Sequence, residues 1–212
     1  MMYQLTYKVN LARAALLLLI VTMVRTNLNI LQWNARGLGA AVHNSTTLPK
    51  NSKINNLNKL IHDLNFPDVI CIQEPLIKNN HVLNFPNYNL EIIFKGTGCR
   101  GLLTMIKKTH TYKVLKSTVN KYITSHTLEI HIQNQTKIHV TNYYRNWENK
   151  NQDIRDNRFI ETVLGHPLKQ NLSAHFIVGD MNAHHNLWGS DKNTKIGKIY
   201  AKIIESPRKY WS

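Results

Sequence analysis

The order of hydrophobic and polar positions along the chain predicts a series of strands. Short continuous apolar runs, and runs in which apolar and polar residues alternate, are typical of strands that bury one or both faces. Leu128, Ile130 and Ile132 alternate with more polar residues, for example, so we expect one face of their strand to be buried. Strands are predicted at Leu28–Asn34, Val69–Gln73, Asn89–Phe94, Gly101–Lys107, Tyr112–Val119, Thr127–Gln133, Lys137–Tyr144 and His175–Asp180.

Two segments repeat apolar residues at intervals of three and four, which is typical of helices. The first runs from Ser52, which can cap a helix, to Asn65. The second is Asp153–Leu164, and the Gly165 and Pro167 that follow it are residues that end helices. Helices placed between strands in this order predict an α/β fold in which two sheets pack together. At 212 residues the chain is of ordinary size for one domain.

Three of the predicted strands end in side chains that carry oxygen atoms. Asn34 ends the first strand, Glu74 follows the second, and Asp180 and Asn182 end the last one. Asp180 and Asn182 are two residues apart, so in an extended backbone they point to the same side. An ordinary turn or cap explains any single strand end of this kind, but three together favour a shared site. Oxygen ligands alone suit Mg²⁺ or Mn²⁺ better than zinc.

The histidines and cysteines do not predict a zinc site. His184 and His185 are adjacent, so in a strand they would point to opposite sides, and no cysteine or third histidine lies near them at metal-binding spacing. Cys71 and Cys99 are the only cysteines, and two cysteines do not make a disulfide framework. We therefore expect an intracellular protein, nuclear or cytoplasmic.

The charge of the chain is strongly positive. It has 27 lysines and arginines against 12 acidic residues, a formal net charge of +15. No acidic residue lies between Glu91 and Glu129, a stretch that holds seven basic ones. Such a surface favours a polyanionic partner, because binding releases the counterions of the polyanion. A solvated basic face and an anionic membrane surface are the alternatives.

The first 27 residues differ in composition from the rest. Ala14–Val24 is an uncharged apolar run preceded by Lys8 and Arg13. It has the length of the apolar part of a secretion signal and is too short to span a membrane, but no small-x-small cleavage site follows it. We expect residues 1–27 to be a leader outside the domain, with secretion as the alternative, and residues 28–212 to be a partial domain.

Three longer strings resemble a known family. Gln32–Leu38, Pro67–Pro75 and Gly179–Ser190 are similar to successive motifs of the endonuclease/exonuclease/phosphatase (DNase I-like) superfamily. They are most similar to the endonuclease domain of jockey-like non-LTR retrotransposons. The resemblance extends from about Leu28 to about Gly197, and its most specific part is the ending Trp-Gly-Ser of the third string.

The resemblance implies a two-sheet α/β sandwich that nicks DNA with Mg²⁺ (or Mn²⁺) and no small-molecule cofactor. In the full-length elements of this family the domain is associated with a reverse transcriptase. On this basis Glu74 and Asn34 are expected to bind the metal, and Asp180 to be the general base. Asn182 is expected to orient Asp180 or to donate to a phosphate oxygen.

The family pattern Asn-x-Tyr-x-Pro implies two further site residues. Asn142 matches its asparagine, expected to contact phosphate or DNA, and Tyr144 matches its tyrosine, expected to donate to the phosphate. Asn146 stands where the proline is usual, which leaves Tyr143 as a competitor for the tyrosine role. Arg36 is expected to bind phosphate, with a plain surface arginine as the alternative.

The end of the chain lacks part of the family pattern. After Asp191 there is no aspartate and no histidine, whereas the related endonucleases continue with a second aspartate and a Ser-Asp-His motif. We therefore expect a sandwich without its last strands and an exposed edge beside His175–Asp180. Two alternatives stay open: an inactive remnant that binds nucleic acid, and a phosphodiesterase of the same superfamily acting on a phospholipid or inositol phosphate.

Overall fold

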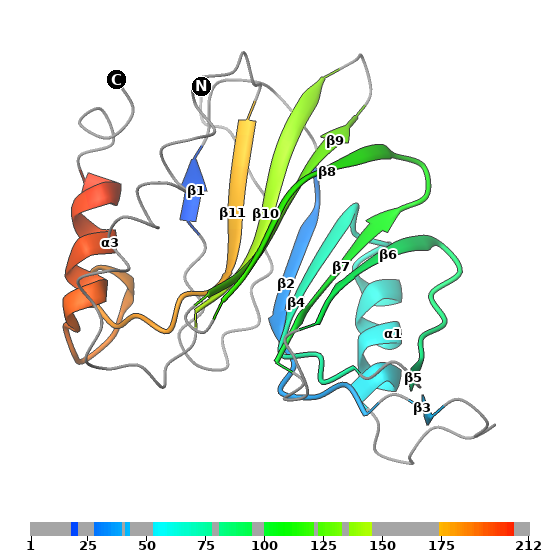
Figure 1. The fold of residues 1–212 in the computed structure, drawn as a ribbon, viewed down its shortest axis with the longest axis horizontal. Helices are drawn as coiled ribbons and strands as arrows, with labels where there is room; N and C mark the ends of the chain where they lie inside the picture. Colours follow the sequence, from blue (N-terminus) through cyan, green and yellow to red (C-terminus); the bar gives the residue numbers. More distant parts are fainter. Residues whose placement is uncertain are drawn as a thin grey trace.

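The computed structural model describes residues 18–20, 28–39, 41–42, 53–77, 81–94, 100–120, 123–132, 136–145 and 174–205. Within these residues the chain forms two sheets that face each other, with helices on their outer sides (Figure 1). This arrangement confirms the predicted two-sheet α/β sandwich. The predicted helix Asp153–Leu164 lies outside the described residues.

The first sheet has four strands in the order β2-β4-β7-β6. Strands β2 and β4 are parallel, and β7 runs antiparallel to both of its neighbours. A two-stranded ladder lies apart from this sheet. The four strands are β2 (Ile30–Asn34), β4 (Val69–Gln73), β7 (Leu102–Lys107) and β6 (Tyr88–Ile93), and the ladder is formed by β3 (Ala41–Val42) and β5 (His81–Val82).

The second sheet has five strands in the order β1-β11-β10-β9-β8. Strands β10 and β11 are parallel, and the other neighbours are antiparallel. A bulge interrupts the pairing of β8 and β9 between Val114 and Lys116. The strands are β1 (Leu18–Ile20), β11 (Ala174–Asp180), β10 (Lys137–Arg145), β9 (Ile123–His131) and β8 (Thr111–Val119).

Alternation along the strands divides the buried side chains between two cores. Helix α1 (Lys53–Asp63) covers the outer face of the four-stranded sheet, where Ile54, Leu57 and Ile61 pack with alternate residues of β4 and β7. The remaining alternate residues point between the sheets. This second core consists of Val69, Cys71, Ile106, Leu128, Ile130, Ile138, Val140, Ala174, Phe176 and Val178.

The edge beside β11 differs from the prediction. β1 pairs antiparallel with β11, opposite residues His175–Ile177, so the expected open edge is wrong over that stretch. An added strand supplies partners for backbone N–H and C=O groups that an open edge would leave unpaired. Leu18–Ile20 belongs to the segment 1–27 that was expected to precede the domain, so three residues of this segment take part in the sheet.

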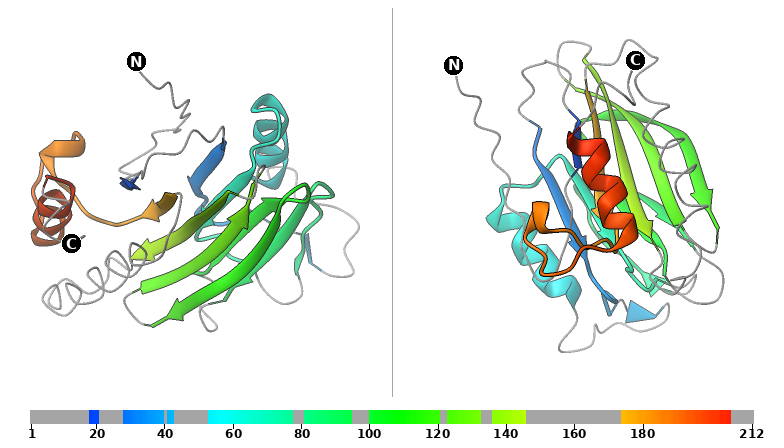
Figure 2. Two further views of the ribbon diagram at one scale, coloured as in Figure 1. Left: turned by 90° about the horizontal axis from the view of Figure 1, so that it is seen from above. Right: turned by 90° about the vertical axis from the view of Figure 1, so that its left-hand side faces the viewer.

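Helix α3 (Lys195–Glu205) was not predicted, although its sequence carries helical signals. The Thr194 hydroxyl accepts a hydrogen bond from the backbone N–H of Gly197 at 3.1 Å, which caps the first turn. Ile196 and Tyr200 are four residues apart and both are buried. Two further views show α3 on the far side of the molecule from α1 (Figure 2).

Candidate active site

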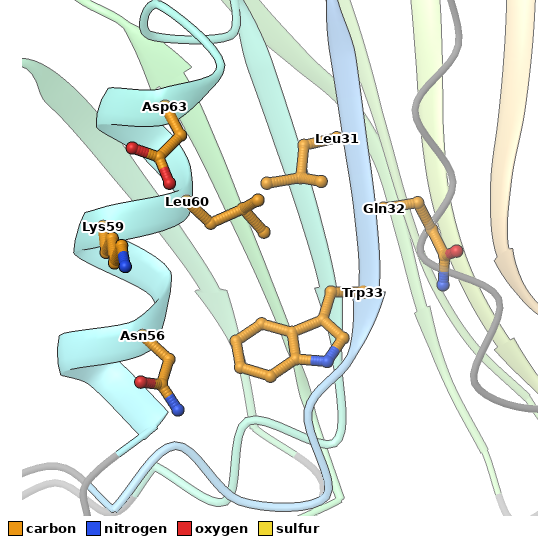
Figure 3. Close-up of a pocket in the computed structure, with 7 residues that line it drawn as sticks. All are labelled: Leu31, Gln32, Trp33, Asn56, Lys59, Leu60 and Asp63. Carbon is orange, nitrogen blue, oxygen red and sulfur yellow. The ribbon is translucent and has the colours of Figure 1, made fainter.

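The strand directions bring several predicted site residues to one end of the sandwich. Because β2 and β4 are parallel, and so are β10 and β11, each pair delivers its carboxyl ends to a common edge (Figure 1). In β2, Leu31 and Trp33 point toward α1 whereas Gln32 points the opposite way (Figure 3). Asn34, two residues after Gln32, therefore shares the face that looks toward the five-stranded sheet.

Asn34 joins the two sheets through its amide nitrogen. Its Nδ2 donates to Oε1 of Glu74 at 3.0 Å and to Oδ2 of Asp180 at 2.6 Å. Its Oδ1 accepts from the backbone N–H of Arg36 at 3.2 Å. Two carboxylates from different sheets thus converge on one side chain, as the strand-end pattern predicted.

Asp180 is held in place by its chain neighbours. Gly179 has φ +153, and a Cβ there would lie 1.8 Å from the carbonyl oxygen of Tyr143, so only glycine fits before the aspartate. The backbone N–H of Asn182 donates to Oδ1 of Asp180 at 2.9 Å. Burial raises the pKa of Asp180, and the hydrogen bonds from Asn182 and Asn34 oppose that shift.

Asn182 contacts Asp180 through its backbone and not through its side chain. Its Nδ2 donates to the backbone oxygen of Arg145 at 2.5 Å, and Nη1 of Arg145 donates to the backbone oxygen of Asn182 at 3.4 Å. The orienting role predicted for Asn182 therefore has a structural basis. The amide nitrogen of Asn182 has a second N–H, so donation to a phosphate oxygen stays a prediction.

The backbone is strained where the site residues lie. Arg36, Glu74 and Asn182 have φ values of 46°, 49° and 43°, and they are three of the six described non-glycine residues with positive φ. This left-handed conformation costs roughly 1–2 kcal/mol for most residue types, and such strain gathers at functional sites. Backbone hydrogen bonds hold Glu74 in this conformation. The N–H of Gly37 donates to the backbone oxygen of Glu74 at 2.7 Å, and the N–H of Glu74 donates to the backbone oxygen of Gly101 at 3.2 Å.

The structure separates the two competing tyrosines. Tyr144 points between the sheets and is 0% exposed, whereas the Tyr143 hydroxyl lies 3.4 Å from that of Tyr200 in α3. Burial raises the pKa of Tyr144, and the nearby charges of Glu74 and Asp180 raise it further. A hydrogen bond between the Tyr144 hydroxyl and the side chain of Glu74 raises the same pKa. Tyr144 is therefore the tyrosine that accompanies the carboxylates.

Asn142 has a position that does not fit contact with phosphate. It is 0% exposed, and its Oδ1 accepts from Nε2 of Gln73 at 2.7 Å. Its Nδ2 donates to the Leu103 oxygen and the Thr104 hydroxyl, both at 3.1 Å. All these partners belong to the opposite sheet, so the predicted phosphate ligand is a clamp between the sheets. The partners of Asn142 are 38 to 69 residues away in the sequence, so the sequence pattern alone does not show that its amide is buried between the sheets.

Three residues that the sequence reasoning did not single out also belong to the surroundings of the site. Gln73 links Asn142 to Gln32, whose Nε2 lies 2.5 Å from Oε1 of Gln73. Arg145 holds the loop of Asn182, as described above. The positive charge of Arg100 lowers the pKa of the Tyr144 hydroxyl, against the effect of burial. Arg100 could have been found as the basic residue that precedes the start of a predicted strand.

The paired histidines have roles in the loop after β11. His185 accepts a hydrogen bond from the backbone N–H of Leu187 at 3.1 Å, and it caps the short helix η5 (Asn186–Trp188). His184 Nδ1 lies 3.2 Å from the Ser190 hydroxyl. The described part of the chain contains no group of three histidine, cysteine or acidic side chains that could hold a metal.

The site itself offers a different set of ligands, which fits Mg²⁺. The two carboxylates of Glu74 and Asp180 converge, and the Asn34 amide between them is a single neutral group. Mg²⁺ commonly uses one or two carboxylates and keeps several waters, so it does not need three charged ligands. Glu74 and Asn34 are the residues that would hold it, and the carboxylate of Asp180 lies next to them.

A separate hollow lies on the other face of β2. It has a volume of about 370 Å³ and is lined by Leu31, Gln32, Trp33, Asn56, Lys59, Leu60 and Asp63 (Figure 3). It lies between β2 and α1, whereas Asn34 faces the five-stranded sheet. The hollow is therefore distinct from the cluster of Asn34, Glu74 and Asp180.

Comparisons with known proteins agree with this fold. Residues 31–211 match the model of the Endonuclease/Exonuclease/phosphatase family. The endonuclease domain of TRAS1, a telomere-specific non-LTR retrotransposon, is similar in structure with a TM-score of 0.59 at 16% identity, over 84% of this chain and 70% of that one. TDP2 from C. elegans has a TM-score of 0.50 at 18% identity, over 74% of this chain and 48% of that one. At these identities the structural similarity shows the fold alone.

Two further results concern sequence relatives and membranes. No curated protein matches this chain. Among the described residues, no helix combines the length and the apolar character needed to cross a bilayer.

Proposed function

Because the chain belongs to the endonuclease/exonuclease/phosphatase family, we propose that it is a DNA-nicking endonuclease domain of a non-LTR retrotransposon, with Mg²⁺ (or Mn²⁺) as its metal. The observation that carries the proposal is the convergence of Glu74 and Asp180 on Asn34, beside the buried Tyr144. In the full-length element this domain would accompany a reverse transcriptase. DNA inside the cell, in the nucleus or the cytoplasm, is the proposed substrate.

Each residue of the cluster has a role in the proposed hydrolysis. Glu74 and Asn34 would hold Mg²⁺, which would supply positive charge to offset the charge that develops on the phosphoryl and leaving oxygens. Asp180 orients the attacking water and accepts its proton at a carboxylate oxygen. The N–H of Asn182 and the amide of Asn34 fix the carboxylate of Asp180 for this task. The Tyr144 hydroxyl donates to a non-bridging oxygen of the phosphate.

The surface charge supports a nucleic-acid substrate. The described strand β8 exposes Lys113 and Lys116, and the chain as a whole carries a formal net charge of +15. A surface of this kind attracts the DNA backbone and makes binding weaker as salt increases.

A plasmid-nicking assay tests the proposal. Purified protein is incubated with supercoiled plasmid in Mg²⁺, and formation of the open-circle form is measured with and without a chelator. Asp180→Asn keeps the size of the side chain but removes the base, so nicking should fall by roughly 10²–10⁴-fold. Asp191→Asn changes an exposed aspartate and serves as the matched control, with activity unchanged.

Three outcomes would contradict the proposal. Equal nicking by the wild type and Asp180→Asn would show that the cluster is not the site. A wild type that is folded and binds DNA but never nicks it would favour the inactive remnant. Hydrolysis of a phosphoinositide but not of DNA would keep the family and replace the substrate.

A further inference from the structure

The proposed site has an unbalanced distribution of charge. Glu74 and Asp180 both contribute negative charge, and a phosphodiester brings one more. Arg36 is exposed and lies on the Asp180 side, where its charge lowers the pKa of that carboxyl. A second cation on the Tyr144 side would hold the phosphate from the opposite direction.

The topology places Arg100 on that side. β7 is antiparallel to β4, so the start of β7 lies beside the end of β4, with Leu102 opposite Gln73. The backbone oxygen of Gly101 accepts from the N–H of Glu74 at 3.2 Å, which ties the residue after Arg100 to the residue that carries the carboxylate. Arg100 therefore directly precedes the residue whose backbone is hydrogen-bonded to Glu74.

The backbone at this point has little freedom. A Cβ on Gly101 would lie 2.1 Å from the carbonyl oxygen of Ile93, so β6 approaches the start of β7 too closely for any other residue. The Nη1 atom of Arg100 is buried, whereas the residue as a whole is half-buried.

The charges around Tyr144 support the same placement. Glu74, Asp180 and Arg100 all act on its hydroxyl, the two carboxylates in one direction and the guanidinium in the other. Arg100 thus approaches the same phenol as the two proposed catalytic carboxylates, and from β7.

We propose that Arg100 binds a non-bridging oxygen of the scissile phosphate, beside the hydroxyl of Tyr144. The proposal rests on the proposed function and adds a residue to it. A guanidinium offers parallel N–H groups in one plane, which match two phosphate oxygens, whereas an ammonium offers a point charge. Arg100 and Arg36 then hold the substrate from two sides, with Arg100 the less exposed of the two.

The test uses a substrate with a single phosphodiester, the dinucleotide TpT, and its uncharged methylphosphonate analogue. Binding of both to the wild type, Arg100→Ala, Arg100→Lys and the control Lys108→Ala is measured by calorimetry at low salt in a chelator, so that no metal contributes. Lys108 is an exposed lysine of the turn between β7 and β8. Thermal melting of each variant shows whether it is folded.

The wild type and Lys108→Ala should prefer the charged dinucleotide, and Arg100→Ala should lose this preference by at least tenfold. Arg100→Lys should recover only part of it. A folded Arg100→Ala that keeps the preference would overturn the proposal, as would a wild type with no preference. If Arg100 only balances the charges of Glu74 and Asp180, Arg100→Ala should melt earlier but keep the preference.

The binding experiment tests the role of Arg100 separately from the proposed nuclease activity. A wild type that does not nick plasmid would refute the proposed function, yet loss of the charge preference in Arg100→Ala would still identify a phosphate site. Where nicking is observed, Arg100→Ala should lower kcat at saturating DNA, whereas Lys108→Ala should change only KM.

Discussion

Replacing Asn142 by alanine should destabilise the fold without removing a contact to DNA. The substitution deletes the acceptor of Gln73 and the donor to the Thr104 hydroxyl, both of which are buried. Leaving one buried polar group unpaired costs about 1–3 kcal/mol, so these two groups together predict a loss of about 2–6 kcal/mol. For a chain of this size each kcal/mol lowers Tm by roughly 2–4 °C, so a loss near the middle of that range lowers it by about 8–16 °C.

Thermal unfolding followed by circular dichroism measures this effect, with Asn58→Ala as the control. Asn58 is an exposed asparagine of α1, and its variant should melt within about 2 °C of the wild type because surface substitutions change stability by less than about 0.5 kcal/mol. DNA binding by fluorescence anisotropy, measured below both melting temperatures, should be the same for all three proteins. An Asn142→Ala protein with an unchanged Tm and weakened DNA binding would refute the clamp and restore the phosphate contact.

Three further substitutions test other parts of the structure. Tyr144→Phe should reduce plasmid nicking at least tenfold and lower Tm slightly, because it removes a buried hydroxyl that hydrogen-bonds to Glu74; Tyr143→Phe is the control, and equal activity of the two variants would contradict the assignment. Mg²⁺ should raise the Tm of the wild type but not of Glu74→Gln in a melting experiment, and an equal rise in both would remove Glu74 from the metal site. Burial lowers the pKa of His175 to about 3, so between the unfolded value of 6.5 and that pH only the unfolded chain takes up a proton and stability falls as pH falls. From pH 6.5 to pH 5 this loss is about 2 kcal/mol, so urea unfolding should show a fall in stability that is larger by about this amount in the wild type than in His175→Gln.

The sequence by itself predicted helix α1, most of the strands and the polar residues at the strand ends. The period of the apolar positions is a local property of the chain, and it predicted α1 and most strands to within a few residues. Asn34, Glu74 and Asp180 could be named because each directly follows or ends an apolar run. Parallel strands with their carboxyl ends at one edge then bring such residues together by topology.

The tertiary structure decided the questions that depend on partners distant in sequence. Asn34 and Asp180 are 146 residues apart, and only the packing of the two sheets shows that they share a hydrogen bond. Tyr143 and Tyr144 occupy adjacent strand positions with equal propensity for a strand, so the choice between them is made by which face the opposite sheet covers. The same reason applies to Asn142, whose partners lie across the interior in other strands.

The pairing of strands also cannot be predicted from the local pattern of apolar and polar residues. Leu18–Ile20 is part of an apolar run whose sequence is equally typical of a leader, and it becomes a strand only because β11 offers an edge for it. Arg100 carries no motif, and its position beside the site follows from the antiparallel pairing of β7 with β4. Local periodicity therefore determined what each segment can form, whereas long-range pairing and burial determined which side chains meet and what each of them does.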